Sequence, residues 1–288
     1  MTVEAYAKVN LTLEVFNRRS DGFHALRSVV LPVSLADTLE IEDAPALTSD
    51  SGYPDDLCLK AARVLDPTRG ARIRVVKRIP AGGGLGGGSA DAAATLLALN
   101  DVWGLGRSRE ELAEIGAEVG SDVPALVLGG PVLMEGRGEK VSRLGRGLET
   151  GDERREGGET ARQEARDLNL VLANPGVFCS TAEVYARCVP RPLADAGASE
   201  RTRQALESGD LKAIAASLMN DLEGPALALH PEIRETMEAL KAAGAEGVLM
   251  SGSGSTVFGL VPTEARGREI ATVLSERGLW ARAVHAVV

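Results

Sequence analysis

The first fifteen residues alternate between apolar and polar side chains, which is the pattern of a β-strand. Residues 3–15 are therefore predicted to form a strand whose apolar positions face a core, namely Val9, Leu11, Leu13 and Val15. Lys8 and Asn10 share the opposite face with Thr12, because residues two apart in a strand point the same way. Two interpretations stay open for that face: it points into water, or it lies beside a polar substrate.

Between residues 28 and 79 the pattern predicts more strands and one helix. Residues 28–35, 37–42 and 71–79 have the composition of strands, and residues 55–65 have apolar spacing typical of a helix that stops before Pro67. The part of the chain before the glycine run at residue 82 is therefore predicted to be mainly β.

Helical spacing becomes more frequent in the rest of the chain. A helix is predicted over residues 92–100, and a second over 108–119, where Ser108 and Glu111 match a capping box. Further on, the sequence predicts strands at 168–174 and 257–261, helical segments at 180–188, 199–208, 211–219 and 230–243, a glycine turn at 250–256, and a closing helix and strand. Strands interleaved with helices indicate a second α+β unit.

Residues 144–167 differ from both flanks. They are charged, rich in glycine and almost without apolar side chains, so we expect an exposed, mobile loop there. This insert divides the chain into a predicted N-terminal domain, 1–143, and a predicted C-terminal domain, 168–288.

The composition of the 288 residues, 44% hydrophobic and 25% charged, is that of a globular protein with a sizeable core. The net charge of -9, without a basic cluster, makes nucleic acid and anionic membranes poor candidate partners. No apolar run is long enough to cross a membrane and the first residues lack a basic start, so a cytoplasmic location is expected. Three cysteines without C-x-x-C spacing indicate neither a disulfide framework nor a zinc site.

Residues 82–88 contain six glycines and stand between a predicted strand and a predicted helix. Free backbone N–H groups that lead into a helix N-terminus form a site suited to phosphate. The run is not a P-loop, because no lysine precedes Ser89. The glycine template of dinucleotide-binding folds matches Gly82, Gly84 and Gly87, but this is weak evidence, since a run of glycines satisfies almost any glycine template. The remaining alternative is that the run is a flexible linker.

Two further polar residues have more than one interpretation. Asp122 follows a glycine and precedes the apolar run 125–128, so it is either the N-cap of a short helix or a carboxylate that faces a cleft. His24 follows an Asp-Gly turn, where a histidine is either an ordinary surface residue or a binding group.

Taken together, three stretches resemble the three motifs of the GHMP kinases, the small-molecule kinases named for galactose, homoserine, mevalonate and phosphomevalonate. The stretches are residues 7–11, 80–91 and 251–256. Residues 5–11, 19–24 and 120–124 are further similar to the branch that acts on 4-diphosphocytidyl-2-C-methyl-D-erythritol. The resemblance covers nearly the whole chain outside the insert. It implies an α+β fold of two domains, the first like domain 2 of ribosomal protein S5 and the second ferredoxin-like, with the active site in the cleft between them.

The resemblance also implies an activity and its residues. The expected reaction is ATP-dependent phosphorylation of the 2-hydroxyl of that substrate, with Asp122 as base and Lys8 as its electrostatic partner. The substrate-binding residues would be Asn10, Phe23, His24 and Tyr185. The ATP site would comprise Lys77, Pro80, Ala81, Gly82, Gly83, Gly84, Leu85, Gly86, Gly87, Gly88, Ser89 and Ala90. Mg²⁺ should accompany ATP, with Ser89 as a candidate ligand and no ligand set assigned.

Two positions depart from the family pattern. Phe23 stands where a tyrosine is usual, which removes one hydroxyl contact, and Asp56 stands where an asparagine often helps to bind adenine. The alternatives are a GHMP kinase for another small alcohol, of the homoserine or mevalonate type, and a nucleotide sensor without catalysis. The pair His24 and Tyr185 argues against the first alternative, and the joint presence of Lys8 and Asp122 against the second. The sequence predicts no oligomeric state.

Overall fold

The structure is a computed structural model that describes residues 1–20, 22–144 and 168–287. The insert predicted to be mobile therefore lies outside the described residues, apart from its first residue, Leu144. The described strands form a sheet of eight and a sheet of four. The larger sheet comprises β1 (Thr2–Asn10), β2 (Thr12–Arg18), β3 (His24–Asp43), β4 (Thr48–Ser49), β5 (Ala71–Val76), β6 (Val132–Gly136), β7 (Lys140–Arg143) and β9 (Met219–Asn220). The smaller, antiparallel sheet has the order β10 (Glu246–Met250), β11 (Val257–Val261), β8 (Asn169–Asn174), β12 (Trp280–His285).

Strand β3 organises the larger sheet, because its twenty residues pair with β1, β2, β5 and β6. The sequence predicted two strands here, over 28–35 and 37–42, and that division is wrong. Asp37 does not interrupt the strand: its carboxylate, fully buried, accepts a hydrogen bond from the backbone N–H of Ile79 at 2.9 Å. A polar side chain with a buried partner can remain inside a strand.

The predicted strand 3–15 is divided into β1 and β2 at Leu11. Both of its faces are covered. Lys8, Asn10 and Thr12 are only 4%, 3% and 0% exposed, so the interpretation that they point into water is wrong. Alternation had identified the two faces correctly, but it could not show that the glycine run and the glycine turn at 250–256 would cover the polar one.

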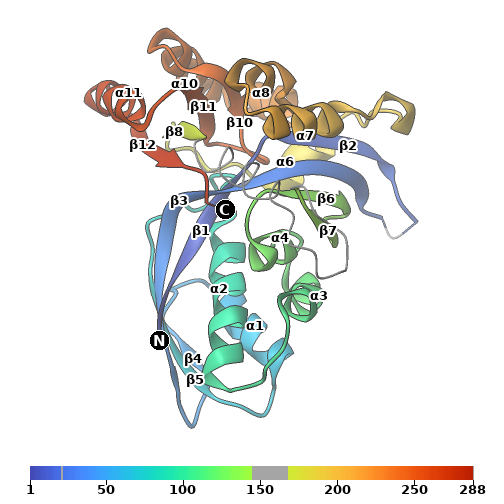
Figure 1. Cartoon of the computed structure of the whole chain (residues 1–288), viewed down its shortest axis with the longest axis vertical. Helices are drawn as coiled ribbons and strands as arrows, with labels where there is room; N and C mark the ends of the chain where they lie inside the picture. Colours follow the sequence, from blue (N-terminus) through green and yellow to red (C-terminus); the bar gives the residue numbers. More distant parts are fainter. Residues whose placement is uncertain (21, 145–167, 288) are drawn as a thin grey trace.

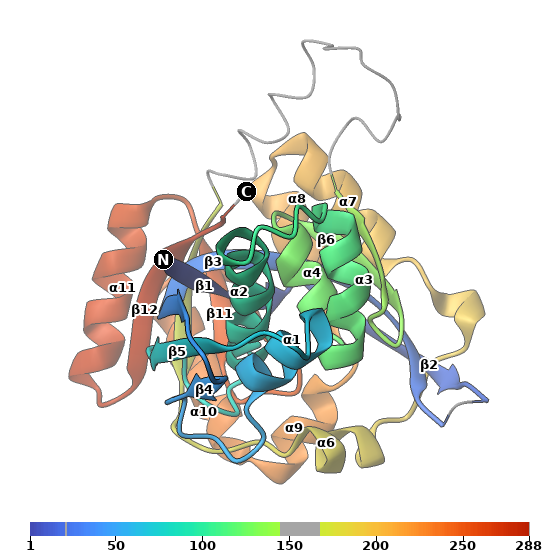
Figure 2. The ribbon, with the colours of Figure 1, turned by 90° about the horizontal axis from the view of Figure 1, so that it is seen from below.

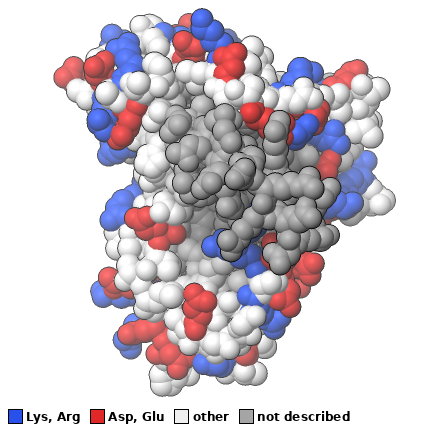
Figure 3. Space-filling model, viewed as in Figure 1, with Lys and Arg blue, Asp and Glu red and all other residues white. Residues whose placement is uncertain are grey.

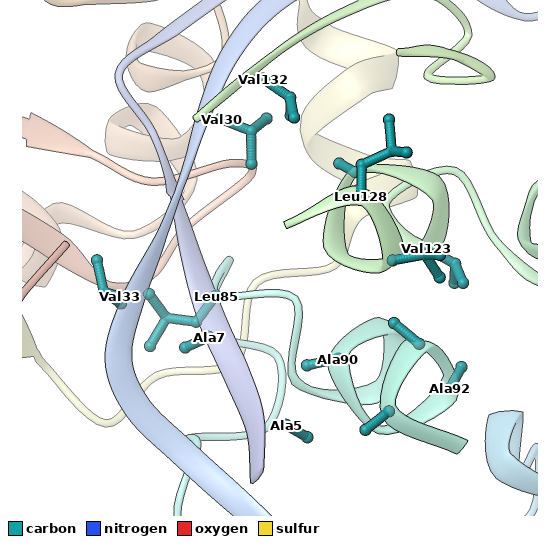
Figure 4. Packing of buried hydrophobic residues seen from close by; sticks show 14 of the residues in the cluster. Ala5, Ala7, Val30, Val33, Leu85, Ala90, Ala92, Val123, Leu128 and Val132 are labelled. Carbon is teal, nitrogen blue, oxygen red and sulfur yellow. The ribbon is translucent and has the colours of Figure 1, made fainter. Parts of the chain in front are cut away.

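The N-terminal half contains the helices α1 (Leu57–Leu65), α2 (Gly87–Val102), α3 (Arg109–Val119) and α4 (Val123–Leu128), and α3 packs against the other three. α2 is central, since it contacts β1, β3 and the other three helices (Figures 1 and 2). Small side chains allow this close packing: Figure 4 shows Ala90 of α2 toward β1, where Ala5 and Ala7 lie. The predicted capping box of Ser108 and Glu111 is present at the start of α3.

The helices of the C-terminal half are α6 (Thr181–Arg187), α7 (Ala198–Ser208), α8 (Leu211–Ser217), α9 (Glu223–Leu229), α10 (Pro231–Ala242) and α11 (Glu264–Glu276). Five of them lie within or close to predicted segments, whereas α9 was not predicted. The α+β class is confirmed. Strand β9, which pairs with β2, shows that the C-terminal half also contributes to the larger sheet. The domain boundary at the insert remains a prediction.

No helix among the described residues is long and apolar enough to cross a membrane. On the face drawn in Figure 3, basic and acidic side chains of the described residues are interspersed around the molecule.

Glu14 links the two halves of the chain. It is fully buried on β2, and its carboxylate accepts hydrogen bonds from the backbone N–H groups of Gly197, Ala198 and Ser199 at 2.9, 3.1 and 3.1 Å. These groups open helix α7, whose first N–H groups have no partner within the helix. Burial alone would raise the pKa of Glu14, but the hydrogen bonds from this helix end prevail and lower it.

We expect Glu14→Gln to lower the free energy of unfolding at neutral pH by about 2 kcal/mol, because a charged acceptor is lost and an amide N–H₂ faces backbone donors. Since the folded-state pKa is depressed, this stabilisation is present above the unfolded pKa and is lost as pH falls through the folded pKa. Urea unfolding at neutral and acidic pH measures both effects. Glu118→Gln, at an exposed position of α3, is the control. An equal loss of unfolding free energy in both variants would contradict the stabilising role of the buried Glu14 carboxylate.

Candidate active site

A cavity of about 1030 Å³ brings together the segments that the sequence singled out. Its walls come from β1, the glycine run, the start of α4 and helix α6. Of the predicted site residues, the cavity is lined by Lys8, Asn10, Phe23, His24, Lys77, Pro80 to Ser89, Asp122 and Tyr185. Ala90 is buried in the core beneath it.

Helix α2 begins at Gly87, inside the glycine run, and not at residue 92 as predicted. Gly86 is its N-cap in the left-handed region, with φ +69°, a conformation that glycine adopts without strain. The N–H groups of Gly87, Gly88 and Ser89 therefore belong to the first turn, which has no acceptor of its own in the helix. These donors line the cavity at the positive end of the helix dipole, so the alternative of a flexible linker is wrong.

The second glycine turn, residues 251–256, packs directly against the first. The N–H of Thr256 donates to the carbonyl of Gly83 at 3.1 Å, and the hydroxyl of Ser251 donates to the carbonyl of Gly84 at 2.9 Å. A Cβ on Gly84 would lie 2.1 Å from the carbonyl oxygen of Ser251. Contact between the two backbones explains why both segments are poor in side chains.

Lys8 and Asp122 form an ion pair in the cavity, with 3.3 Å between Lys8 Nζ and Asp122 Oδ2. Lys8 also donates to Asn10 Oδ1 at 2.6 Å and to the carbonyl of Gly84 at 3.2 Å. The amide of Asn10 in turn donates to the hydroxyl of Ser28 at 2.8 Å. Lys8 is thus held by fixed partners, while the Asp122 side chain remains 30% exposed toward the cavity.

Asp122 occupies the N-cap position of α4, but its side chain makes no capping hydrogen bond. The N-cap interpretation is therefore correct for the backbone and wrong for the carboxylate. A carboxylate that does not cap a helix and that faces a cavity is available as a proton acceptor.

His24 and Tyr185 lie at another part of the same cavity. Their ring centroids are 6.1 Å apart, and His24 Nδ1 lies 2.8 Å from the carbonyl oxygen of Phe16, which orients the imidazole. Burial, and secondarily the charge of Asp122, raises the pKa of Tyr185, so its phenol stays neutral. Phe23 is 56% exposed, with the Arg137 guanidinium 5.6 Å from its ring centroid. These groups form an aromatic wall with polar edges.

Sequence reasoning missed several polar residues that hold this site. Ser28 and Ser251 orient Asn10 and the glycine run, and Asp37 and Asp91 bind Lys77, each at 2.5 Å from its Nζ. Single serines in strands and turns carry no distinctive sequence signal. Asp56 caps α1 by accepting from the N–H groups of Cys58 and Leu59. Burial would raise its pKa, but hydrogen bonds, first from the hydroxyls of Ser49 and Ser51 and then from these N–H groups, prevail and lower it.

Comparison with known proteins identifies the family. The family model of the GHMP kinases N terminal domain matches residues 56–130, and that of the GHMP kinases C terminal matches residues 202–278. The chain belongs to the GHMP kinases. It is accordingly an ATP-dependent small-molecule kinase, and the α+β fold of this family, expected from the motifs, is confirmed.

Curated relatives from Brevibacillus brevis and Symbiobacterium thermophilum, each named 4-diphosphocytidyl-2-C-methyl-D-erythritol kinase, are 38% and 42% identical to this kinase. The matches cover 95% and 93% of this chain and 92% and 93% of the relatives. A crystal structure of 4-(cytidine 5'-diphospho)-2C-methyl-D-erythritol kinase, 34% identical, matches with a TM-score of 0.78 over 100% of this chain and 99% of that one. A homoserine kinase from Cytophaga hutchinsonii, 18% identical, matches with a TM-score of 0.73, over 100% of this chain and 94% of that one, and shows the shared fold alone.

Proposed function

We propose that this kinase transfers the γ-phosphoryl group of ATP to the 2-hydroxyl of 4-diphosphocytidyl-2-C-methyl-D-erythritol, a step of the non-mevalonate route to isoprenoid precursors. Relatives with 37–42% identity over more than nine-tenths of this chain carry the name of that activity. The cavity offers a ring-binding wall at His24 and Tyr185 and a phosphate-binding helix end at Gly87, as a cytidyl substrate and ATP require.

The observation that carries the proposal is the Lys8–Asp122 pair beside the start of α2. Asp122 would accept the proton of the attacking hydroxyl, and the ammonium of Lys8 would stabilise negative charge that develops during transfer. The carbonyl of Gly84 and the amide of Asn10 hold Lys8 in place, so no reorganisation is needed when charge develops. Phosphoryl transfer depends mainly on such positioning and charge stabilisation.

Mg²⁺ belongs to this proposal as a companion of ATP. The described residues contain no group of three or more His, Cys, Asp or Glu side chains placed to hold a metal. This fits a metal bound mainly by phosphate oxygens and water, as Mg²⁺ prefers, with the hydroxyl of Ser89 on the cavity wall as the candidate protein ligand. The bound ion would neutralise phosphate charge.

A panel of acceptors tests the substrate assignment. We expect ADP release from ATP and Mg²⁺ to show a kcat/KM for the cytidyl substrate that exceeds those for homoserine and mevalonate by orders of magnitude, because only the former can engage His24 and Tyr185. A higher kcat/KM for either simple alcohol would replace the assignment with that of another GHMP kinase. Absence of turnover with every acceptor, despite ATP binding, would favour the nucleotide sensor.

Tyr185 provides a narrower test of the cytidyl site. Tyr185→Leu should raise the KM for the cytidyl substrate about fivefold, because an aromatic contact of roughly 1 kcal/mol is lost. Tyr185→Phe keeps the ring and should stay within about twofold of the wild type. The ATP Kd should be the same in all three proteins. Equal KM values for the Leu and Phe variants would refute stacking at this residue.

A further inference from the structure

Arg191 and Asp221 form a two-pronged ion pair outside the cavity. Arg191 Nη2 lies 2.5 Å from Asp221 Oδ1, and Arg191 Nε donates to Asp221 Oδ2 at 2.7 Å. Two parallel hydrogen bonds of this kind fix the orientation of the two side chains as well as their distance. Neither residue lines the cavity, so the pair can affect a bound molecule only through other residues.

The ion pair is linked to strand β2 at Val15. The N–H of Val15 donates to Asp221 Oδ2 at 2.8 Å, and its carbonyl accepts from the N–H of Arg191 at 2.9 Å. Strand β9, which pairs with β2, ends directly before Asp221. The two residues therefore continue the hydrogen bonding along this edge of β2 past the end of β9. The carbonyl of the next residue, Phe16, lies 2.8 Å from His24 Nδ1 and orients the imidazole.

The same ion pair is linked to the end of α6, the helix that carries Tyr185. Cys188 is the C-cap of α6, and its N–H donates to the carbonyl of Tyr185 at 3.1 Å. The thiol of Cys188 lies 3.8 Å from the carbonyl oxygen of Asp221, and Arg191 follows three residues later in the chain. The ring-binding wall thus has two halves, His24 reached through β2 and Tyr185 through α6, and one ion pair is linked to both.

We propose that Arg191 and Asp221 are positioning residues, which set the spacing between His24 and Tyr185 and thereby the fit of the cytidyl ring. The two ring centroids are 6.1 Å apart, and the ring planes are inclined by 31°. Spacing matters at such a wall, because a gap of about 0.5–1 Å already forfeits a quarter to a half of a dispersion contact. The proposal rests on the proposed function, since it takes the cytidyl substrate as the bound molecule.

The contacts of the Arg191 guanidinium support a positioning role over a binding role. Each of its three nitrogens has a partner within the protein: Nε and Nη2 on Asp221, and Nη1 on the carbonyl of Asp195 at 3.4 Å. The Arg191 and Asp221 side chains are only 27% and 14% exposed, so their attraction is screened less than that of a surface pair. The pair is therefore suited to hold two backbone segments at a fixed distance.

Arg191→Lys tests the proposal, because lysine keeps the positive charge but cannot form two parallel hydrogen bonds with one carboxylate. The KM for the cytidyl substrate should rise about fivefold, an effect comparable with loss of the Tyr185 ring contact. The kcat and the ATP Kd should stay within about twofold of the wild type, because other contacts hold Lys8 and the glycine run. Steady-state ADP release and a separate ATP titration measure these quantities.

Arg203→Lys is the matched control. Arg203 makes the same two-pronged contact with Glu200 on α7, at 2.9 and 2.6 Å, and neither residue lines the cavity. This variant should match the wild type in KM, kcat and ATP Kd. If Arg191 only stabilised the fold, Arg191→Lys would lower the active fraction, and hence the apparent kcat, without a change in KM. That pattern, or values equal to those of the wild type, would overturn the proposal.

A double variant shows whether the ion pair acts through the ring-binding wall. Arg191→Lys combined with Tyr185→Leu should have a KM only about twofold above that of Tyr185→Leu alone, because one half of the wall is already lost. Residues that act through one another show such non-additive effects, whereas independent effects combine in full. A further fivefold rise in the double variant would overturn the link to Tyr185.

Hydrogen exchange tests the positioning role without an acceptor. Arg191→Lys should accelerate amide exchange in residues 13–17 of β2 and 184–188 at the end of α6, and Arg203→Lys should not. Absence of turnover of the cytidyl substrate by the wild type would overturn the proposed function. Unchanged exchange in both segments of Arg191→Lys would overturn the positioning role, whichever acceptor the wild type uses.

Discussion

Replacement of Asp122 by asparagine should lower kcat by about three orders of magnitude, within the range of about 10²–10⁴ that a general base contributes. The Asn side chain retains the size of the carboxylate but cannot accept the proton of the attacking hydroxyl. The ATP Kd should change little, because the phosphate donors belong to the glycine run and α2. Steady-state ADP release and a separate ATP titration distinguish the two effects.

Glu118→Gln provides the matched control, since it makes the same chemical change at an exposed residue of the preceding helix. It should leave kcat within about twofold of the wild type, as surface substitutions remote from a site usually do. If Asp122→Asn lowers kcat by less than about tenfold, Asp122 is not the general base.

Gly84→Ala is expected to abolish measurable ATP turnover and to lower the free energy of unfolding by about 3 kcal/mol or more. An effect of this size is expected because the substitution both overpacks a buried contact and strains φ. Its φ is +73°, and the new Cβ would lie 2.1 Å from the carbonyl oxygen of Ser251. Backbone cannot move aside as a flexible side chain can. The two glycine turns would separate, and the carbonyl that holds Lys8 would shift with them.

Gly104→Ala separates backbone strain from this contact. Gly104 has a similar φ of +66°, but a Cβ there meets nothing within 4 Å. The free energy of unfolding of Gly104→Ala should fall by only about 1 kcal/mol, which is the conformational cost alone, and ATP turnover should be unchanged. Thermal unfolding and ADP release compare the two variants. Equal destabilisation would show that φ, and not the contact between the turns, makes Gly84 necessary.

Much of this architecture is accessible from the sequence because the signals are local. Alternation in residues 3–15 separates the faces of β1 and β2, and the capping residues of α3 mark its start. Local signals fail where the hydrogen-bonding partner of a residue lies far away in the sequence. The division of β3 at Asp37 was mispredicted because the backbone that binds this carboxylate comes some forty residues later in the chain.

Some residues of the candidate site are likewise visible in the sequence, and others are found only from the fold. The glycine run and Asp122 stand out as motifs, and the resemblance to the GHMP kinases gave them roles that spacing alone left open. Ser28 and Ser251 could not be found in this manner, because each acts through one hydroxyl brought to the site by the fold. Lys77 was expected near the nucleotide, but its two buried carboxylate partners emerge only when β3 and α2 are placed on either side of it. Asp91, next to the run, lacked any spacing that indicates an ion pair.

The most direct test of the account is identification of the product made from ATP, Mg²⁺ and 4-diphosphocytidyl-2-C-methyl-D-erythritol by the purified protein. Phosphorus NMR and mass spectrometry should find one new phosphate, on the 2-hydroxyl, for each ADP released, and no ADP release when the acceptor is omitted. ADP released without a phosphorylated acceptor, or a phosphate on another hydroxyl, would contradict the placement of the acceptor against Asp122 and Lys8.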